Sequence, residues 1–277
     1  MEKNIKILVA AHKADPNIKS DDIYMPIHVG KALHPEVDLG FQGDDTGDNI
    51  SEKNGSYCEL TAMYWAWKNL KNVDIIGLAH YRRYLKLDVK KYLSFLNDGG
   101  IILPYPYHER FNNFSNLAFL LTHEEATIAV DLLLKVFPDS KCIVRDYFWR
   151  SNKYSVYNMF IMNWKIFDEY CGFLFNYLEK LEKILKKNSY IRLQRNIGYI
   201  SEVLLGFWVR YKNLRVKYVK TQDFSKKSRG NIRDKLINLH RDIGFHYLFL
   251  PSRQKIKFYS ATVNSLRNQD YNINDYE

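Results

Sequence analysis

Two nearly continuous apolar runs constrain the fold of this chain more than any other feature. The first, Ile5–Ala11, ends in His12-Lys13, and the second, Val73–Ala79, ends in the polar run HYRRY at residues 80–84. Runs of this length without polar alternation are typical of strands buried on both faces, as in parallel sheets. Because amphipathic helical patterns separate and follow them, the sequence predicts an α/β layer fold with a mostly parallel central sheet.

Helical and strand patterns fill the rest of the chain up to about residue 220. Ser56 and Glu59 have the spacing of a capping box, which favours a structural, helix-starting role for Glu59 over a role as a buried acid. Thr122 and Glu125 have the same spacing. Alternation over Tyr154–Met162 predicts a strand. The other predictions are helices over 88–97, 123–136, 164–187 and 198–212, and strands over 101–103 and 214–220.

The composition excludes several classes of protein. Of the 277 residues, 46% are hydrophobic and 15% are aromatic, which excludes a disordered or collagen-like chain. Three widely spaced cysteines exclude a disulfide framework and a CxxC zinc site. No apolar stretch approaches the roughly 18 residues that span a bilayer, and no signal-peptide pattern follows Met1. We therefore expect a cytoplasmic protein.

The net charge of +10 is concentrated near the C-terminus. Residues 1–209 carry 26 basic and 25 acidic side chains, whereas residues 210–257 carry 14 basic and 3 acidic ones. An excess confined to one segment favours a single face for an anionic partner over a uniformly basic surface. We therefore expect an α/β domain over 1–221 and a basic, aromatic and helical C-terminal extension over 222–277.

The polar residues that follow the two buried strands are the first candidates for a site. In open α/β sheets, ligands bind outside the carboxyl ends of the strands. The adjacent Arg82 and Arg83 offer planar donors to a diphosphate there, although they could instead pair with acidic loops. Neither GxGxxG nor a P-loop motif occurs, which disfavours a dinucleotide site and a P-loop.

Acidic and amide side chains provide further candidates. Asp44, Asp45 and Asp48 could hold a hard divalent cation through oxygen ligands, or they could form an ordinary turn. The amide of Asn158, inside the predicted strand, either completes a hydrogen-bond network or touches a ligand. Glu202, near a helix start, either complements the helix dipole or faces a cleft as a general base.

Several blocks of the sequence resemble one bacterial family. Over about residues 3–212 the chain is similar to domain-of-unknown-function family 4422 of capsular and exopolysaccharide glycosyltransferases. The blocks are IKILVAAHK at 5–13, GDNISEKN at 47–54, YCELTAMYWAWKN at 57–69 and GLAHYRRY at 77–84, with weaker similarity at 157–162, 167–170 and 198–202. The resemblance implies a GT-A-like, Rossmann-like single domain and a hexosyltransferase that uses a nucleotide sugar.

The expected reaction, under this resemblance, moves a sugar from a UDP-sugar to a lipid-linked oligosaccharide in capsule, exopolysaccharide or O-antigen synthesis. UDP-galactofuranose is one candidate donor. Most GT-A enzymes hold a divalent cation with Asp-x-Asp, but this chain has HYRR at 80–83. Arginines there could neutralise the leaving diphosphate without a metal. Whether Asp44, Asp45 and Asp48 hold a Mn²⁺ or Mg²⁺ ion is a question that the sequence leaves open.

Residue roles follow from the same resemblance. The expected catalytic residues are Glu202, as the base of an inverting reaction, and three groups at the leaving diphosphate. These three are His80, Arg82 and Arg83. The expected nucleotide and donor contacts are Ala11, His12, Lys13, Asp45, Asn49, Lys53, Asn54, Tyr81 and Asn158. Asp168 and Glu169 are the alternative candidates for the base. Candidates for stacking on sugar or uracil are Tyr81, Tyr84 and Trp65, although core packing is the commoner fate of Trp65.

The basic C-terminal segment fits two kinds of partner. Basic residues beside the apolar run 243–250 favour an anionic membrane surface, which would make the protein peripheral on the inner face of the cell membrane. The alternative is a non-enzymatic nucleic-acid-binding protein. Because no RRM, KH or helix-turn-helix signature is present, we expect no nucleic-acid partner. A third interpretation, a metal-dependent phosphohydrolase, lacks a histidine-rich second cluster.

Overall fold

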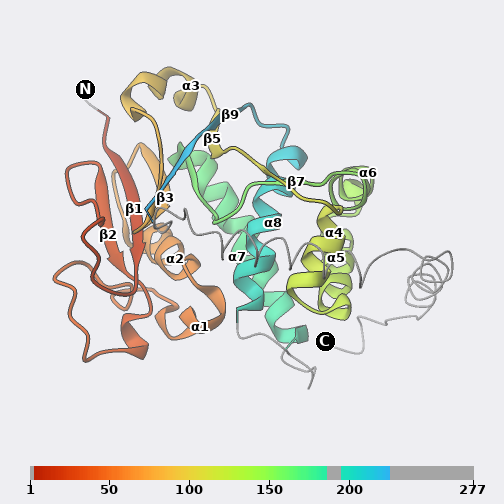
Figure 1. Ribbon diagram of the computed structural model, residues 1–277, viewed down its shortest axis with the longest axis horizontal. Helices are drawn as coiled ribbons and strands as arrows, with labels where there is room; N and C mark the ends of the chain where they lie inside the picture. The colour runs from red at the N-terminus through yellow and green to blue at the C-terminus, as the bar shows by residue number, and fades with distance from the viewer. Residues whose placement is uncertain (1–2, 186–194, 225–277) are drawn as a thin grey trace, which may run out of the picture. The chain divides into compact units, whose positions relative to one another are not determined.

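The computed structural model describes residues 3–185 and 195–224, and a mixed sheet forms the centre of this part of the chain (Figure 1). β1 lies between β2 and β3, and β8, β5 and β9 continue the sheet beyond β3. β4 and β10 extend it from the end of β3. The strands are β1 Ile5–Ala11, β2 Tyr24–His28, β3 Ile75–His80, β4 Arg83–Leu85, β5 Ile101–Pro104, β8 Phe160–Asn163, β9 Val216–Val219 and β10 Thr221–Asp223.

The two longest strand pairings, β1 with β2 and β1 with β3, are parallel, as is that of β5 with β9. β8 is antiparallel to both β3 and β5, and β4 is antiparallel to β3 and β10. The predicted α/β fold with a mostly parallel central sheet is confirmed, and β8 supplies the antiparallel strand at its centre.

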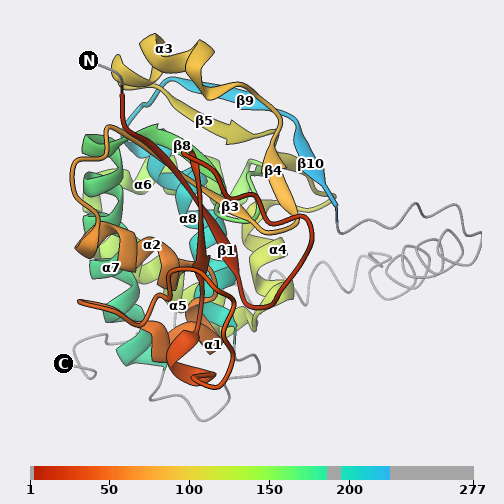
Figure 2. The same ribbon diagram turned by 90° about the vertical axis from the view of Figure 1, so that its left-hand side faces the viewer.

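Helices cover both faces of the sheet (Figure 2). On one face α2 and α7 pack on the strands, where Phe160 of β8 contacts Phe167 and Tyr170 at ring-centroid distances of 5.9 and 6.3 Å. On the other face, side chains such as Leu96 of α3 close a second apolar cluster over Ile7. The helices are α1 Asn54–Tyr57, α2 Leu60–Asn69, α3 Leu93–Asn97, α4 Asn113–Leu120, α5 His123–Val136, α6 Lys141–Val144, α7 Trp164–Leu185 and α8 Asn196–Tyr211.

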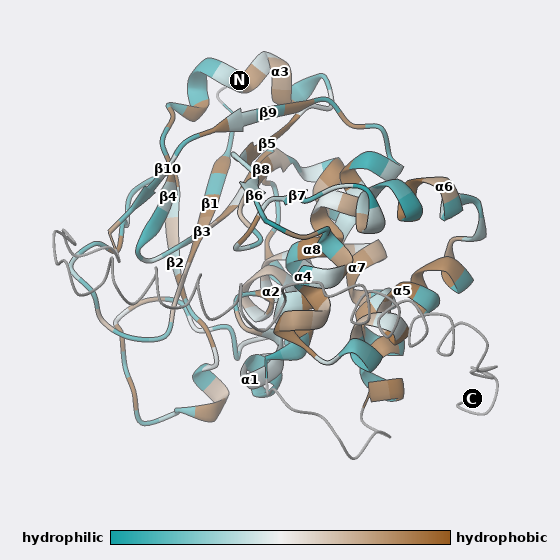
Figure 3. Ribbon diagram, turned by 45° about the vertical axis from the view of Figure 1, so that its right-hand side comes forward, coloured by the Kyte–Doolittle hydropathy of each residue, from teal (hydrophilic) through white to brown (hydrophobic). Residues whose placement is uncertain are grey.

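The helices α4, α5 and α6 lie beyond α8, on the side away from β1 and β2 (Figure 1). The predicted Thr122–Glu125 capping box is present at the start of α5, with both of its hydrogen bonds made. In the hydropathy view, apolar residues follow the helix faces that pack together (Figure 3). A short ribbon of β6 (Tyr107–His108) and β7 (Lys153–Tyr154) lies near α8.

Two predicted elements differ from the structure. The predicted strand Tyr154–Met162 is split into β7 and β8, because Tyr157 and Asn158 adopt left-handed backbone angles, φ of +70° and +50°, which no strand accommodates. The Ser56–Glu59 capping box is absent, since Glu59 makes no side-chain bond to the start of α2. Both differences fall at the same place in the fold, which is described below.

The predicted boundary at residue 221 lies close to the limit of the described residues. β10 pairs with β4 through Asp223, so the sheet includes two residues beyond that boundary. The rest of the predicted extension, from residue 225 onward, lies outside the described residues. Within 3–185 and 195–224, no helix has the length and apolar character needed to cross a membrane.

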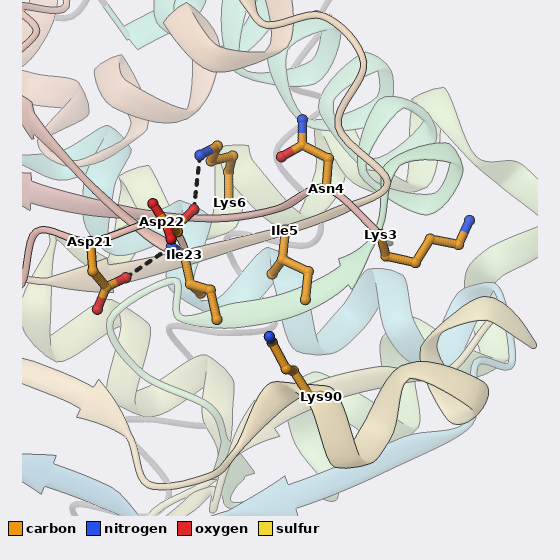
Figure 4. Close-up of a pocket in the computed structure, with 8 residues that line it drawn as sticks. All are labelled: Lys3, Asn4, Ile5, Lys6, Asp21, Asp22, Ile23 and Lys90. Carbon is orange, nitrogen blue, oxygen red and sulfur yellow. Dashed lines mark hydrogen bonds between the residues drawn. The ribbon is translucent and has the colours of Figure 1, made fainter. Parts of the chain in front are cut away.

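A pocket of about 560 Å³ lies at the amino end of β1 (Figure 4). Its lining includes Lys3, Lys6 and Lys90 together with Asp21 and Asp22. Lys3 pairs with Asp74 at 2.8 Å, and Lys6 donates to the carbonyl of Asp22 at 2.8 Å. None of the predicted site residues lines this pocket, which lies at the opposite end of β1 from His12.

Candidate active site

Several elements converge at the carboxyl ends of β1 and β3. His12 follows β1, and His80 is the last residue of β3. β8 runs antiparallel to β3 with Phe160 opposite Leu78, so the segment just before Phe160 lies at this same edge. The start of α2 and the first turns of α8 complete the site, because side chains from both bond to that segment.

A buried hydrogen-bond network joins three of these elements. The amide Nδ2 of Asn158 donates to Glu59 Oε1 and to Ser201 Oγ, each at 2.8 Å. Ser201 Oγ in turn donates to the carbonyl of Gly198 at 2.6 Å. Glu59 is 8% exposed, Asn158 2% and Ser201 0%. A buried carboxylate therefore sits at the start of α2, held by an amide that lies 99 residues away in the chain.

The other amide atom of Asn158 lacks a protein partner. Its Oδ1 is fully buried and accepts no hydrogen bond. Leaving a buried acceptor unsatisfied costs roughly 1–3 kcal/mol. The left-handed backbone of Tyr157 and Asn158 adds strain, since non-glycine residues rarely adopt φ above zero. A buried acceptor held in strained backbone next to a carboxylate is a feature typical of a ligand site.

His80 is oriented by the same segment. Its Nε2 lies 2.7 Å from the carbonyl oxygen of Tyr157 and 3.9 Å from Glu59 Oε1. Because a carbonyl only accepts, Nε2 carries the proton. The imidazole therefore has a fixed tautomer, with Nδ1 as its other polar atom.

Glu202 has the most perturbed carboxyl group of the site. Burial, and after it the neighbouring charge of Glu59, raise its pKa from the ordinary 4.5 to about 8. A hydrogen bond from the Tyr157 backbone N–H and the charges of Arg195 and Arg83 act in the opposite direction. Burial and the nearby charge of Glu59 thus favour the protonated form of Glu202. Such perturbed carboxyl groups are common in active sites.

The two predicted arginines both have acidic partners. Arg82 Nε lies 2.6 Å from Asp15 Oδ2, and Arg83 Nε lies 3.2 Å from Asp223 Oδ2. The backbone N–H of residue 17 and then Arg82 lower the pKa of Asp15. The guanidinium of Arg83 also lies over the Tyr157 ring at 4.3 Å. A guanidinium has five N–H donors, so a carboxylate at Nε leaves the group able to contact a phosphate.

The predicted residues after β1 lie beside this cluster. His12 is exposed and contacts Tyr81 edge-on at 5.3 Å between ring centroids. Partial burial lowers its pKa, and the charges of Lys13, Arg195 and Arg82 lower it further. Ala11 is fully buried as the last residue of β1, so it can contribute only its backbone. These residues place positive charge and an aromatic ring at the mouth of the site.

The three predicted cation ligands do not gather. Asp44 is buried, and its carboxylate accepts hydrogen bonds from the backbone N–H groups of residues 30 and 31 and from the Ser51 hydroxyl. Asp48 accepts from the Tyr64 hydroxyl at 3.1 Å, and Asp45 is exposed. Over residues 3–185 and 195–224, no group of three or more His, Cys, Asp or Glu side chains is arranged to hold a metal ion. The acidic run at 44–48 thus fits its other interpretation, an ordinary turn. Its three carboxylates are not arranged to share a cation.

Asn49, Lys53 and Asn54, three predicted nucleotide contacts, make structural contacts in the segment before α2. Asn54 Nδ2 donates to the carbonyl of Cys58 at 2.7 Å and to Thr61 Oγ1 at 3.0 Å, which fixes the junction between α1 and α2. Lys53 pairs with Glu182 of α7 at 2.7 Å. Asn49 holds its own turn through the carbonyls of residues 45 and 47. Asn54 therefore positions the start of α2, Lys53 links this segment to α7, and Asn49 stabilises the preceding turn.

The two alternative candidates for the base, and two of the predicted stacking residues, contact protein groups elsewhere in the fold. Asp168 accepts from Trp67 Nε1 at 2.7 Å, and Glu169 pairs with Lys212 at 3.2 Å. Tyr84 is fully buried and bonded through its hydroxyl to the carbonyl of residue 17, and Trp65 is 5% exposed. Tyr84 and Trp65 are therefore packed in the core and cannot stack on a ligand as they stand.

The sequence did not point to Ser201, Arg195 or Cys58 as neighbours of the site, and it favoured a capping role for Glu59 over a buried acid. Arg195 Nε donates to Cys58 Sγ at 3.2 Å, and Cys58 has a φ of +53°. Glu59 was assigned to a capping box, and its real partner comes from a distant segment. The one available signal was the polar Asn158 in an apolar run, which required a buried partner.

Comparisons with known proteins find a solved structure with a similar fold. The chain is similar to the solved apo structure of the WbbM bifunctional glycosyltransferase, with 28% sequence identity and a TM-score of 0.72. The similarity covers 81% of this chain but 46% of WbbM, so this chain spans less than half the length of that protein. A comparison with curated proteins found no match.

A family model matches most of the chain. It is described as a domain of unknown function, DUF4422, and it matches residues 6–213. This range contains β1 from its second residue onward, β3, β8 and the residues of α8 at the candidate site. The chain therefore belongs to the DUF4422 family.

Proposed function

We propose that this chain transfers a glycosyl group from a UDP-sugar to a hydroxyl group of a glycan acceptor. The observation that carries the proposal is the raised pKa of Glu202 next to the Tyr157–Asn158 segment, from which it accepts the Tyr157 backbone N–H. Both lie at the carboxyl edge of β1 and β3, where ligands of α/β sheets bind. The similarity to a glycosyltransferase structure supports the same reaction class.

Glu202 is the proposed base. In a direct displacement, the acceptor oxygen bonds to the anomeric carbon while the bond from that carbon to the diphosphate oxygen breaks. The acceptor proton moves to Glu202, and UDP leaves with the electron pair. A carboxylate with a raised pKa is a stronger base than an ordinary one once it is deprotonated. The reaction inverts the anomeric carbon and needs no covalent intermediate.

The cationic side of the site stabilises the leaving group. Arg82 and Arg83 lie directly after the end of β3, where they can donate hydrogen bonds to the diphosphate as its negative charge increases. His80, the last residue of β3, would border the same position, with its Nε2–H bonded to the Tyr157 carbonyl. Asn158, which is 2% exposed, would act on the donor through Glu59, whose Oε1 accepts from its Nδ2 at 2.8 Å. His12, Lys13 and Tyr81 would border the nucleotide.

The finer assignments rest on the sequence resemblance. We place UDP-galactofuranose first among donors and a lipid-linked oligosaccharide of capsule, exopolysaccharide or O-antigen synthesis first among acceptors. The basic segment 210–257 supports peripheral binding to an anionic membrane. Flotation of the full chain with anionic and neutral vesicles tests this, and equal flotation with both at low salt contradicts it.

The reaction is tested by UDP release from a panel of UDP-sugars with and without acceptor. Acceptor-dependent UDP release is the expected result. Arg82→Ala and Arg83→Ala should each lower kcat by about tenfold or more, with the diphosphate losing one charge-assisted partner. Lys183→Ala, which removes an exposed ion pair on α7, is the control. Wild-type rates in both arginine variants would contradict the leaving-group assignment.

A further inference from the structure

Exposed tyrosines lie next to the site and have no role in the chemistry above. Tyr105 is 57% exposed, Tyr107 45% and Tyr218 39%. They belong to neighbouring segments, the end of β5, the β6 strand and the β9 strand. Large aromatic side chains held at a surface commonly mark an interaction site when they are grouped.

The tyrosines form ordered ring contacts. Tyr105 and Tyr218 stack with their ring centroids 6.2 Å apart and an interplanar angle of 26°. The backbone beneath them is fixed, because Tyr105 N–H donates to the carbonyl of Val219 at 3.0 Å and Leu103 pairs with Tyr218 in the sheet. The rings therefore present a pre-organised surface, which lowers the entropy lost on binding.

Tyr107, two residues after Tyr105 in the chain, connects this region to the candidate active site. Tyr107 contacts Tyr157 edge-on at 6.3 Å, and Tyr157 contacts His80 at 6.0 Å. Arg83 covers the Tyr157 ring at 4.3 Å. Ring contacts thus lead from the exposed β6 ribbon to His80, which lies 3.9 Å from Glu59.

We propose that Tyr105, Tyr107 and Tyr218 form the acceptor subsite, where they bind the sugar residues of a glycan chain behind the one that receives the new sugar. This inference rests on the proposed function and names the side from which the acceptor enters. A sugar ring has an apolar C–H face that gains free energy when it covers an aromatic ring, and hydroxyls at its rim that a tyrosine hydroxyl can bond. A polymeric acceptor is the ligand that can reach the site while covering an extended row of rings.

The test uses the full chain and an array of purified bacterial capsular and O-antigen polysaccharides. We expect the wild-type chain to bind at least one polysaccharide and the Tyr105→Ala/Tyr218→Ala double variant to bind it at least about tenfold more weakly. Tyr105→Phe/Tyr218→Phe keeps the rings and should retain most of the binding. Phe119→Ala, at an exposed aromatic residue of α4 (62%), is the matched control and should bind like wild type.

A parallel titration with UDP separates this inference from the proposed function. Equal UDP affinity in all four proteins together with selective loss of polysaccharide binding supports the acceptor subsite. UDP binding without any polysaccharide binding, or equal polysaccharide binding by the double alanine variant, overturns it. Loss of UDP affinity in the double alanine variant also overturns it, because the rings would then hold the nucleotide. If the wild-type chain does not bind UDP, the proposed function itself fails.

Discussion

At the residue scale, Glu202 is a carboxyl group whose pKa is raised by burial and which lies at the edge of the sheet. Replacing it by Gln keeps its size and removes the base. We expect Glu202→Gln to lower kcat by about 10²–10⁴-fold while UDP affinity changes little, because general-base catalysis contributes about that much. Steady-state kinetics and calorimetric UDP binding measure the two effects. Glu169→Gln, at an exposed carboxylate of α7, should keep the wild-type rate.

The raised pKa of Glu202 also predicts how stability depends on pH. Its pKa is about 8 in the folded protein against an ordinary value of 4.5. Between these values the folded chain holds a proton that the unfolded chain has released, so Glu202 makes the protein less stable as the pH rises through this range. Gln cannot titrate, and Glu202→Gln should lack this loss.

Chemical denaturation at pH 5.5 and pH 9 measures the difference. We expect the wild-type free energy of unfolding to fall by roughly 1–3 kcal/mol more than that of Glu202→Gln, which allows for partial contact of this half-buried group with water. Other titrating groups cancel in the comparison. An identical pH dependence in the two proteins would show that Glu202 has an ordinary pKa.

The local sequence pointed to candidate residues but not to their partners in the fold. The sequence left Glu202 with two interpretations, a complement to the helix dipole or a base, and its role as the base stays a prediction. Glu59 was misassigned because its spacing from Ser56 fits a helix cap, while its actual partner, Asn158, is brought close only by the pairing of β8 with β3. Local spacing contains no information about that pairing.

At the scale of elements, the segment between β7 and β8 holds the site together. Asn158→Asp replaces the donor Nδ2 by an oxygen and places two carboxylates about where the 2.8 Å hydrogen bond was. We expect Asn158→Asp to be less stable than Asn158→Ala at pH 7.5, by about 1 kcal/mol or more, and the gap to shrink at pH 5.5 as the pair takes up a proton. Thermal unfolding at both pH values measures it.

A matched control for this substitution is Asn213→Asp. Asn213 also has a left-handed backbone, with a φ of +50°, but its side chain is exposed. This variant should change little at either pH. If Asn158→Asp is as stable as Asn158→Ala at both pH values, the Glu59–Asn158 bond does not hold the site.

Periodicity was sufficient for the regular elements and failed at the irregular one. The apolar run Ile5–Ala11 is β1, and the long amphipathic pattern from Trp164 is α7 through Leu185. The stretch Tyr154–Met162 also alternates, but Tyr157 and Asn158 turn the chain before β8 begins. Strain of this kind is stabilised by tertiary contacts, so the alternation of the sequence does not reveal it.

At the scale of the whole molecule, charge is distributed by segment. The net charge of +10 suggests a general polyanion binder, but residues 1–209 carry 26 basic and 25 acidic side chains. In the described residues, positive charge reaches the site through Arg82, Arg83 and Arg195, each of which contacts a protein group. A diphosphate must therefore compete with Asp15 and Asp223 for the two guanidinium groups. We expect the affinity for the diphosphate to be moderate and to fall as salt increases.

This charge distribution predicts that UDP binding does not depend on a divalent cation. The carboxylates of Asp44 and Asp48 are engaged by donors of the protein, and the arginines after β3 are the groups that can neutralise a diphosphate. We expect UDP affinity measured by calorimetry to change less than about threefold between Mn²⁺ and chelator, and to fall as salt rises from about 50 to 300 mM. Arg82→Ala/Arg83→Ala should lose affinity and most of that salt dependence, whereas Lys183→Ala should keep both. A loss of affinity beyond about tenfold on chelation would place a cation at the diphosphate and assign charge neutralisation to it in place of the arginines.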